Sequence, residues 1–568
     1  MGNVANFVRR LMTKLKLQPA ADQTRYRVVV WEACVVLVLL AVVAAVGRGP
    51  WDPDELKYAQ VVKGMKVTGD LFVPHLWGDV YPDKPPLYFW LVLGFAPFFT
   101  GVGLPALLAP VVLAACLGLW LVAHIASRWY GEQAGMLAAV VLVSLPLYLI
   151  TAQIGRMDML LCLFITAAVY CMYVGYIENC DRAKVLTFVL MGLGVLAKGP
   201  LGIIFPFAIG GAFLAATGNL RKLWCPASGV GVLVLTAVLA IWMVPAVASE
   251  GPGYLGQLLG EHSLQYAVSG LDHPEPPYFY LYILPVLLLP WVIFLKPAVS
   301  TAWSGWREQH NPRELFLLCW AVVPLVILSL VRAKLPVYLL PAMPPIAILV
   351  GRYWNELLTE RAGYDRLQWR VAALSAFAGV GGLAVVAAGL LVNWKEFEPH
   401  VIASGGTLLV VIGLVGWMIN RWGSTHRAYN VFWALAAVAP CGALYLALIF
   451  LPPLDASQSW RAVADSLAAA RSPAEPVVVY RLRPFLGYFV NQEVACFERP
   501  KHLPQLAALV HKHGSVWCAV RTEDLDALQR YCLVDCQSGG AQPSPKGPVQ
   551  VVRLRPLDVA EHARRGKG

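Results

Sequence analysis

The sequence predicts an all-α polytopic membrane protein with about thirteen transmembrane helices, followed by a small C-terminal α/β domain outside the membrane. Three observations lead to this fold class. The 568 residues are 58% hydrophobic and only 14% charged, whereas soluble domains carry about 25% charged residues. Apolar runs of about 20 residues, long enough to cross a bilayer, recur between residues 28 and 451. Beyond residue 452 the composition becomes that of a soluble domain.

Basic residues are concentrated in the short segments between the apolar runs. The net charge of +11 could indicate nucleic-acid binding, but this placement is typical of the positive-inside rule. We therefore expect membrane lipids and no nucleic acid among the partners. Residues 1–27 are rich in Lys and Arg and are predicted to be a cytoplasmic segment. The apolar run that follows has no clear cleavage pattern, so we expect a retained helix.

The orientation of the chain depends on residues 87–103, which are apolar enough to span. If they crossed, the basic loop at Arg221 and Lys222 would be external, and residues 249–277, which contain no Lys or Arg, would be cytoplasmic. If they lie at the interface, both loops obey the positive-inside rule. We therefore predict a first external loop at 47–103 within a transmembrane domain of residues 28–451. The spans are predicted near 28–46, 104–126, 134–152, 157–177, 185–197, 200–217, 228–248, 278–296, 314–331, 337–351, 371–392, 404–420 and 431–451.

An odd number of spans places residues 452–568 outside the membrane. Helical patterns at 457–470, 503–512 and 523–531 alternate with strand patterns at 476–481 and 515–520, which indicates an α/β module. Four cysteines fall in this segment: Cys496, Cys518, Cys532 and Cys536. An oxidising compartment would permit disulfides between them, although their spacing predicts no particular pairing.

Charged side chains beside the hydrocarbon region are costly and need an explanation. On the predicted topology they gather at the external ends of the spans, whereas the cytoplasmic ends carry scattered Arg. The external set comprises Asp54, Glu55, Lys57, Asp83, Lys84, Arg156, Asp158, Lys198, Glu261, His262, Arg332 and Lys334. This asymmetry predicts that any chemistry takes place at the external face.

The start of the first external loop allows two interpretations. As a helix start, Asp52 caps, Pro53 occupies the first position and Glu55 completes a capping box. On that helix, however, Asp54 shares a face with Lys57 and Tyr58. A carboxylate held there can act as a general base or as a metal ligand.

Two cationic segments raise the same choice. Lys84 stands between prolines in Pro82-Asp83-Lys84-Pro85-Pro86; this is either a turn into an interfacial helix or a rigid mount for a lysine that binds a lipid phosphate. Arg332 and Lys334 form a second cationic pair between two spans, and snorkelling to headgroups would explain them equally well.

At these residues the sequence resembles a known family. The motifs are Asp54-Glu55, Gly69-Asp70, Pro74-His75, Tyr81, Lys84-Pro85-Pro86, Tyr88, Trp90, Arg156-Met157-Asp158, Ala197-Lys198-Gly199-Pro200, Glu261-His262 and 334–341 (KLPVYLLP). In this order they resemble bacterial polyprenyl-phosphate-sugar-dependent glycosyltransferases of the GT-C fold. This group contains the lipid A aminoarabinose transferases and relatives of the protein O-mannosyltransferases. The resemblance covers about the first 345 residues.

The resemblance implies specific roles for these residues. Asp54 would be the essential acidic residue and Lys84 would contact the donor phosphate, so both are predicted catalytic residues. The predicted substrate-binding residues are Glu55, Lys57, Tyr58, Tyr81, Arg156, Asp158, Lys198, Arg332, Lys334 and Tyr338. A divalent metal ion is a further expectation, with Asp83, His262 and His273 as candidate ligands.

Two departures from the family pattern leave the sugar and the acceptor open. Glu261-His262 is followed by Ser263-Leu264-Gln265-Tyr266 without the family's arginine, and Lys57 stands where an arginine is common. The resemblance implies a multi-pass protein of the bacterial inner membrane, with the N-terminus cytoplasmic and the C-terminal domain periplasmic. We expect transfer of a sugar from a polyprenyl-phosphate donor to a lipid, glycan or protein. A transporter or flippase of lipid-linked or small anionic substrates is the alternative, and a catalytically inactive scaffold is the third.

Overall fold

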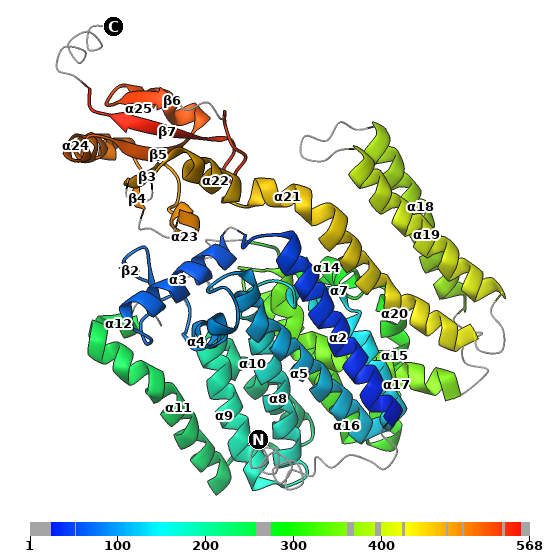
Figure 1. Cartoon of the computed structure of the whole chain (residues 1–568). Coiled ribbons are helices and arrows are strands. Elements are labelled where there is room, and N and C mark those ends of the chain that lie inside the picture. Colours follow the sequence, from blue (N-terminus) through cyan, green and yellow to red (C-terminus); the bar gives the residue numbers. More distant parts are fainter. Residues whose placement is uncertain are drawn as a thin grey trace.

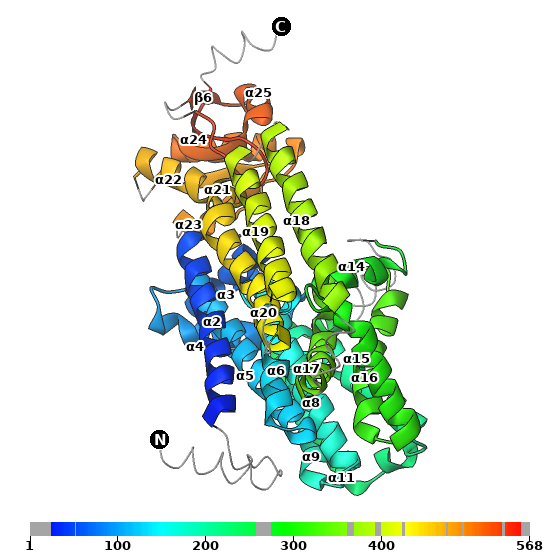
Figure 2. The same cartoon turned by 90° about the vertical axis from the view of Figure 1, so that its right-hand side faces the viewer.

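A computed structural model describes the chain except for its termini and several short segments (Figure 1). The described residues are 24–51, 53–256, 274–359, 368–391, 399–422, 427–472, 475–490, 494–536 and 540–557. They form a helical membrane body, an external layer built from the first loop, and a C-terminal module. The first residues of α2 and the C-terminal sheet lie at opposite ends of the molecule (Figures 1 and 2).

The membrane body is a bundle of long apolar helices. Its helices are α2 (Thr24–Gly47), α5 (Leu104–Tyr130), α6 (Glu132–Val143), α7 (Pro146–Thr151), α8 (Asp158–Tyr176), α9 (Asp181–Lys198), α10 (Leu201–Ala216), η2 (Leu220–Leu223), α11 (Pro226–Glu250), α12 (Gly253–Gly256), α14 (Phe279–Leu287), α15 (Val292–Gln309), α16 (Pro312–Leu330), η4 (Pro336–Ala342), α17 (Met343–Thr359), α18 (Gln368–Leu391), α19 (Pro399–Trp422), α20 (Arg427–Tyr445) and the π-helical η6 (Leu446–Phe450). Close packing at the centre needs small residues: a Cβ on Gly351 of α17 would lie 2.5 Å from the backbone nitrogen of Ala138 on α6.

The predicted count of about thirteen spans is not confirmed. Among the described residues, eight helices are long and apolar enough to cross a membrane, or nine if the bent pair α14–α15 is one span. Two predicted spans are not continuous helices. The span at 134–152 is broken before Pro146, whose ring disfavours a helical conformation at Leu145. The span at 278–296 is bent by 106° between α14 and α15, beside Pro290, which has no backbone N–H to continue a helix.

The hairpin of α18 and α19 stands apart from the rest of the body (Figure 1). In the most apolar stretch of α8, 83% of the residues are buried, against 17% for α18 and 11% for α19. The two hairpin helices approach each other through glycines. A Cβ on Gly382 would lie 2.6 Å from the carbonyl oxygen of Gly406, and one on Gly406 would lie 2.6 Å from that of Gly382. The two backbones therefore approach so closely that neither glycine leaves room for a side chain.

The first external loop forms a layer over one end of the body. It contains α3 (Asp54–Thr68), the antiparallel pair β1 (His75–Leu76) and β2 (Asp79–Val80), α4 (Leu87–Phe95) and η1 (Ala96–Phe98). The apolar helical stretch from Leu87 to Phe98 falls short of a spanning length. At 1.5 Å per residue it extends about 18 Å, whereas the hydrocarbon core is about 30 Å thick. Its length thus favours the predicted interfacial placement of residues 87–103.

The C-terminal module is a five-stranded sheet with helices on both faces. Its elements are α21 (Leu451–Gln458), α22 (Arg461–Ala470), β3 (Val477–Tyr480), α23 (Leu486–Val490), β4 (Ala495–Phe497), η7 (Pro500–His502), α24 (Leu503–His513), β5 (Val516–Arg521), η8 (Thr522–Asp524), α25 (Leu525–Gln529), β6 (Leu533–Cys536) and β7 (Val549–Arg555). The strand order is β4-β3-β5-β7-β6, with β3 parallel to β4 and β5, and β7 antiparallel to β5 and β6.

Alternate residues of the central strands enter two separate cores. Val477 and Trp517 pack on one face of the sheet with α22, and Val478 and Cys518 pack on the other with α24. The predicted helix at 503–512 and the predicted strand at 515–520 coincide with α24 and β5. Cys496, Cys518 and Cys532 are free thiols, and the side chain of Cys536 lies outside the described part of the chain.

Candidate active site

Glu55, on the first turn of α3, is buried in an ion pair. Its carboxylate accepts two hydrogen bonds from the guanidinium of Arg48, at the end of α2, one of them 2.9 Å long. It also accepts the backbone N–H of Trp51 (2.9 Å) and of Gly155 (2.7 Å). Both charged side chains are 4% exposed. The carboxylate joins the connection between α2 and α3 to the segment before α8, which favours a structural role for Glu55 over substrate binding or a simple capping box.

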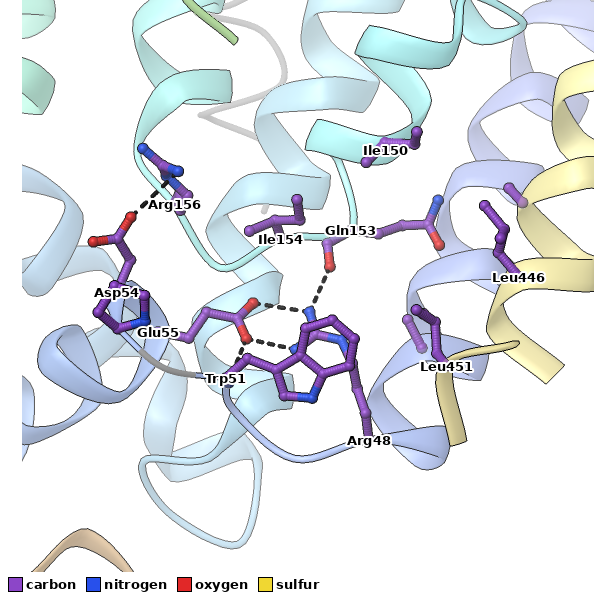
Figure 3. A pocket seen from close by; sticks show the side chains of 13 residues that line it. Arg48, Trp51, Asp54, Glu55, Ile150, Gln153, Ile154, Arg156, Leu446 and Leu451 are labelled. Atoms are coloured by element: carbon purple, nitrogen blue, oxygen red, sulfur yellow. Dashed lines mark hydrogen bonds and ion pairs between the residues drawn. The ribbon is translucent and has the colours of Figure 1, made fainter. Parts of the chain in front are cut away.

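Asp54, its neighbour, faces a different group. Its Oδ2 lies 3.2 Å from Nη1 of Arg156, in the segment between α7 and α8 (Figure 3). Nε of Arg156 lies 3.3 Å from Oδ2 of Asp158, and the other oxygen of Asp158 pairs with Nζ of Lys198. We call these four residues the charge relay of the site, meaning a row of alternating acidic and basic side chains joined by ion pairs and not a path for protons. Its outer members, Asp54 and Arg156, are 31% and 25% exposed, whereas Asp158 is 4% exposed.

The relay keeps Arg156 charged. Burial by itself lowers the pKa of the Arg156 guanidinium, but the carboxylates of Asp158 and Asp54 outweigh burial and raise that pKa above its ordinary value. Arg156 therefore holds two carboxylates in place at once. One oxygen of Asp54 is fixed by this contact, and the exposed fraction of the side chain lets a substrate approach the carboxylate.

Two further predicted residues join the inner end of the relay. Nζ of Lys198 lies 5.0 Å from the ring centre of Tyr338, in η4, at cation–π distance. Lys84 is close enough to Asp158 and Lys198 to interact electrostatically with both, and its Nζ donates a hydrogen bond to the carbonyl oxygen of Asp83 (3.2 Å). Residues far apart in sequence thus meet at one end of the bundle.

Aromatic side chains pack behind the relay. Tyr58 is buried, with its ring 5.8 Å from that of Tyr88, and Tyr81 is also buried. Burial, followed by the nearby carboxylate of Asp54, raises the pKa of Tyr58 well above its ordinary value, so its hydroxyl stays protonated. Tyr58 and Tyr81 interact electrostatically with each other, and Tyr58 does so with Arg156 as well.

The remaining predicted residues are less closely associated. Lys334 donates to the carbonyl oxygens of Glu275 (3.1 Å) and Val331, and Arg332 is exposed. Neither contacts the relay within the described part of the chain, so the structure does not bring this cationic pair into the cluster. Lys57 is half-buried on α3 and forms no ion pair with any of the residues that the structure describes.

The metal prediction stays a prediction. Of its three candidate ligands, Asp83 is placed, in the turn before α4, and His262 and His273 lie outside the described residues. The described residues contain no group of three or more His, Cys, Asp or Glu side chains that could hold a metal ion. Asp83 and Lys84 are adjacent, so an ion at Asp83 would lie beside the predicted phosphate ligand.

A cavity of about 280 Å³ opens beside Asp54. Asp54 and Arg156 lie together at one side of it, and the side chain of Gln153 points toward Leu446 at the other (Figure 3). The opposite wall is apolar and comes from the end of α20, the π-helical η6 and the start of α21, through Ala443, Leu446 and Leu451. Such a cavity suits an amphipathic molecule, with its polar part at the relay and its chain against the apolar wall.

Sequence reasoning overlooked Arg48 and Gln153, both in the cavity wall. Arg48 follows an apolar run directly, and a charge at that position is a signal that could have identified it. Gln153 carries no such signal, because a single amide next to an apolar run is common in interfacial segments.

Comparisons with known proteins decide the family. Residues 83–244 match the family model of dolichyl-phosphate-mannose-protein mannosyltransferases. The undecaprenyl phosphate-alpha-4-amino-4-deoxy-L-arabinose arabinosyl transferase of Edwardsiella ictaluri is 31% identical over 436 residues, which cover 74% of this chain and 76% of that protein. The chain belongs to the undecaprenyl phosphate-aminoarabinose transferase family. The enzyme of the same description from Pectobacterium atrosepticum is 30% identical, over 74% of this chain and 75% of the relative.

A solved structure supports the fold of this aminoarabinose transferase family member. ArnT from Cupriavidus metallidurans, bound to undecaprenyl phosphate, superposes with a TM-score of 0.77 at 18% identity, over 95% of this chain and 99% of that one. The predicted GT-C membrane fold is confirmed. The chain is a multi-pass glycosyltransferase of the bacterial inner membrane that uses a polyprenyl-phosphate-linked sugar. The transporter alternative finds no support in these comparisons.

Proposed function

We propose that this enzyme transfers its sugar at the periplasmic face, with Lys84 binding the donor phosphate and Asp54 acting at the acceptor. The observation that carries the proposal is the charge relay, in which Arg156 holds Asp54 at one end while Lys84 and Tyr338 lie beside the other. A glycosyl phosphate presents both a negative charge and a reacting carbon, and this cluster offers a cation and a carboxylate for them.

The residues divide the work of bond breaking and bond making. Cleavage of the sugar–phosphate bond leaves negative charge on the lipid phosphate and develops positive charge on the sugar ring. Lys84 stabilises the phosphate as it departs. Asp54 takes the proton of the attacking acceptor hydroxyl, which forms the new glycosidic bond from the opposite face and inverts the anomeric centre. If the acceptor is itself a phosphate, no proton needs to be removed, and Asp54 instead orients the reacting groups.

The orientation in the membrane is part of the proposal. The relay lies at the same end of the bundle as α3 and the C-terminal module (Figure 1), and Arg128, Arg313 and Arg352 belong to ion pairs or hydrogen bonds among the other ends of α5, α16 and α17. By the positive-inside rule, the arginine-rich end is cytoplasmic and the relay end periplasmic. The N-terminus is then cytoplasmic and the C-terminal module periplasmic.

The sugar and the metal are the finer parts of the proposal. The relatives' names give 4-amino-4-deoxy-L-arabinose on undecaprenyl phosphate as the first donor to test, and lipid, glycan and protein remain the acceptor classes. A divalent ion held by Asp83 together with His262 or His273 would neutralise part of the donor's phosphate charge. Activity with and without a chelator, restored by added Mg²⁺ or Mn²⁺, tests this part separately.

The deciding experiment is transfer of labelled sugar by the purified protein in nanodiscs. We expect label to move from undecaprenyl-phosphate aminoarabinose to lipid A, or to another lipid, glycan or protein supplied in parallel. Asp54→Asn should abolish this transfer. Asp79→Asn, an exposed carboxylate on β2 in the same loop, is the matched control and should transfer normally. Equal transfer by Asp54→Asn and wild type would refute the assignment of the site.

A further inference from the structure

Helix α21, which continues the last membrane span (residues 427–455) into the C-terminal module, contacts the turn that leads into α3. Oδ1 of Asp455, on α21, accepts the backbone N–H of Gly49 (3.0 Å) and the indole Nε1–H of Trp51 (2.7 Å). Gly49 and Trp51 belong to the short connection between α2 and α3, and α3 begins at Asp54. One carboxylate oxygen therefore fixes the backbone a few residues before the proposed base, although it comes from a residue some 400 positions away in the chain.

The same module holds α3 along its length. Nε2 of Gln60 donates to the carbonyl oxygen of Pro484 (3.1 Å), and Nζ of Lys63 donates to that of Tyr488 (2.7 Å). Nζ of Lys63 also lies 4.2 Å from the centre of the Tyr488 ring, and the hydroxyl of Tyr488 donates to the carbonyl oxygen of Val102 (2.9 Å). These contacts connect α3 and the end of the first external loop to the segment around α23.

Apolar side chains also pack α3 against the C-terminal module. Leu56, two residues after Asp54, is fully buried and packs in the core of the C-terminal module with Trp460 and Phe485. Phe485 in turn meets the ring of Trp77, at 5.3 Å between ring centres. Asp54 thus lies on a helix whose one side faces the relay and whose other side is part of the module's core.

We propose that Asp455 is a positioning residue, which sets the place of Asp54 by fixing the turn before α3. This inference rests on the proposed function of Asp54. The C-terminal module then takes part in the reaction through the position that it gives to Asp54. Small displacements matter in such a site, because moving a reacting group by about 1 Å can cost about a hundredfold in rate.

The test uses the full-length protein and three variants. Asp455→Ala removes the shared acceptor, so we expect turnover to fall about tenfold or more while affinity for undecaprenyl phosphate stays within about twofold of wild type. Asp455→Asn keeps a carbonyl oxygen that can accept both hydrogen bonds, so it should retain most of the turnover. Asp465→Ala, an exposed carboxylate on α22 in the same module, should behave as wild type.

The outcomes separate this inference from the proposed function. Wild-type turnover in folded Asp455→Ala, or an Asn variant as impaired as the Ala variant, overturns the positioning role. If Asp455→Ala does not fold, Trp51→Phe removes one of the two donors; a severalfold loss of turnover at unchanged phosphate affinity supports the inference, and unchanged turnover overturns it. Asp54→Asn is measured in parallel, and normal transfer by that variant would refute the catalytic assignment itself.

Discussion

The two ends of the membrane body both carry ion pairs, but they use them differently. At the end opposite the relay, Glu314 is fully buried, pairs with Arg352 and accepts a hydrogen bond from the hydroxyl of Tyr130 (3.0 Å). Arg352 also binds Glu356 (3.0 Å). At the relay end, Arg156 is likewise shared between two carboxylates, and the side chain of Asp54 is 31% exposed and lines a cavity. Glu356 is 39% exposed but is not among the residues that line this cavity.

The cavity indicates where chemistry can occur. A buried ion pair whose charged groups are already occupied by protein partners costs desolvation and contributes mainly to a fixed structure. A partly exposed carboxylate that lines a cavity can still bind another group. The presence of charges therefore does not locate the active site; partly exposed charges that line a cavity do.

The largest effect is expected from Asp54→Asn. The amide keeps the shape of the side chain but cannot take a proton, so turnover should fall at least about a hundredfold, or about 2.7 kcal/mol in activation free energy. Affinity for undecaprenyl phosphate should be largely retained. Single-turnover rates and donor affinities in nanodiscs measure both quantities. A fall in donor affinity without a fall in turnover would make the relay a binding site only.

Lys84→Ala should weaken donor binding as well as turnover. A hydrogen bond to a charged group contributes about 1.5–3 kcal/mol, so we expect affinity for undecaprenyl phosphate to fall about tenfold to a hundredfold. Lys84→Arg should restore part of it, because a planar fork replaces a compact ammonium. Titration of each purified variant with undecaprenyl phosphate checks this, and unchanged affinity in Lys84→Ala would place the phosphate elsewhere.

Arg156→Lys compares the two ends directly. A single ammonium cannot hold Asp54 and Asp158 in the geometry of the guanidinium, so turnover should fall about tenfold while donor affinity stays the same. The matched control is Arg128→Lys, at the other end, where Arg128 binds Glu178 at 2.6 Å. That variant should turn over normally. Equal losses in the two variants would remove the distinction between the ends.

Glu314→Gln should lower stability and leave the chemistry intact. The amide can still accept the hydrogen bond from Tyr130, but Arg352 loses one of its two carboxylate partners. We expect a cost of about 1–3 kcal/mol, seen as a lower midpoint of thermal unfolding. Transfer measured well below that midpoint should match wild type. Lost transfer in a fully folded variant would show that this end also serves the reaction.

Most members of the charged cluster could be picked out from the sequence because these residues are chemically unusual at their positions. Charged residues next to apolar spans are rare, so Asp54, Lys84, Arg156, Asp158 and Lys198 stood out one by one. Their order along the chain supplied the family resemblance. The structure shows that these charged residues lie close together, which no local sequence pattern could predict.

Other features of the structure could not be predicted from the sequence, for physical reasons. Asp54 and Glu55 are adjacent carboxylates, and only the positions of Arg48 and Gly155 decide which of them becomes a buried structural group. Lys334 bonds to backbone carbonyls because residues 274 and 333 pair across the loop, a contact that sequence cannot show. Hydropathy is averaged over a window of residues, so the average predicts one span across α14 and α15. It does not register the break at Pro290 between them.

The glycine contacts of α18 and α19 have a consequence for the surrounding lipid. Few of the most apolar residues in either helix are covered by the rest of the protein, so acyl chains form most of the solvent around this pair. Its stability then depends on how well two exposed helices match the thickness of the bilayer. Helices α5, α6, α8 and α17 pack against one another, so their stability depends less on the thickness of the bilayer. Changing acyl-chain length should therefore strain the hairpin before it disturbs the relay.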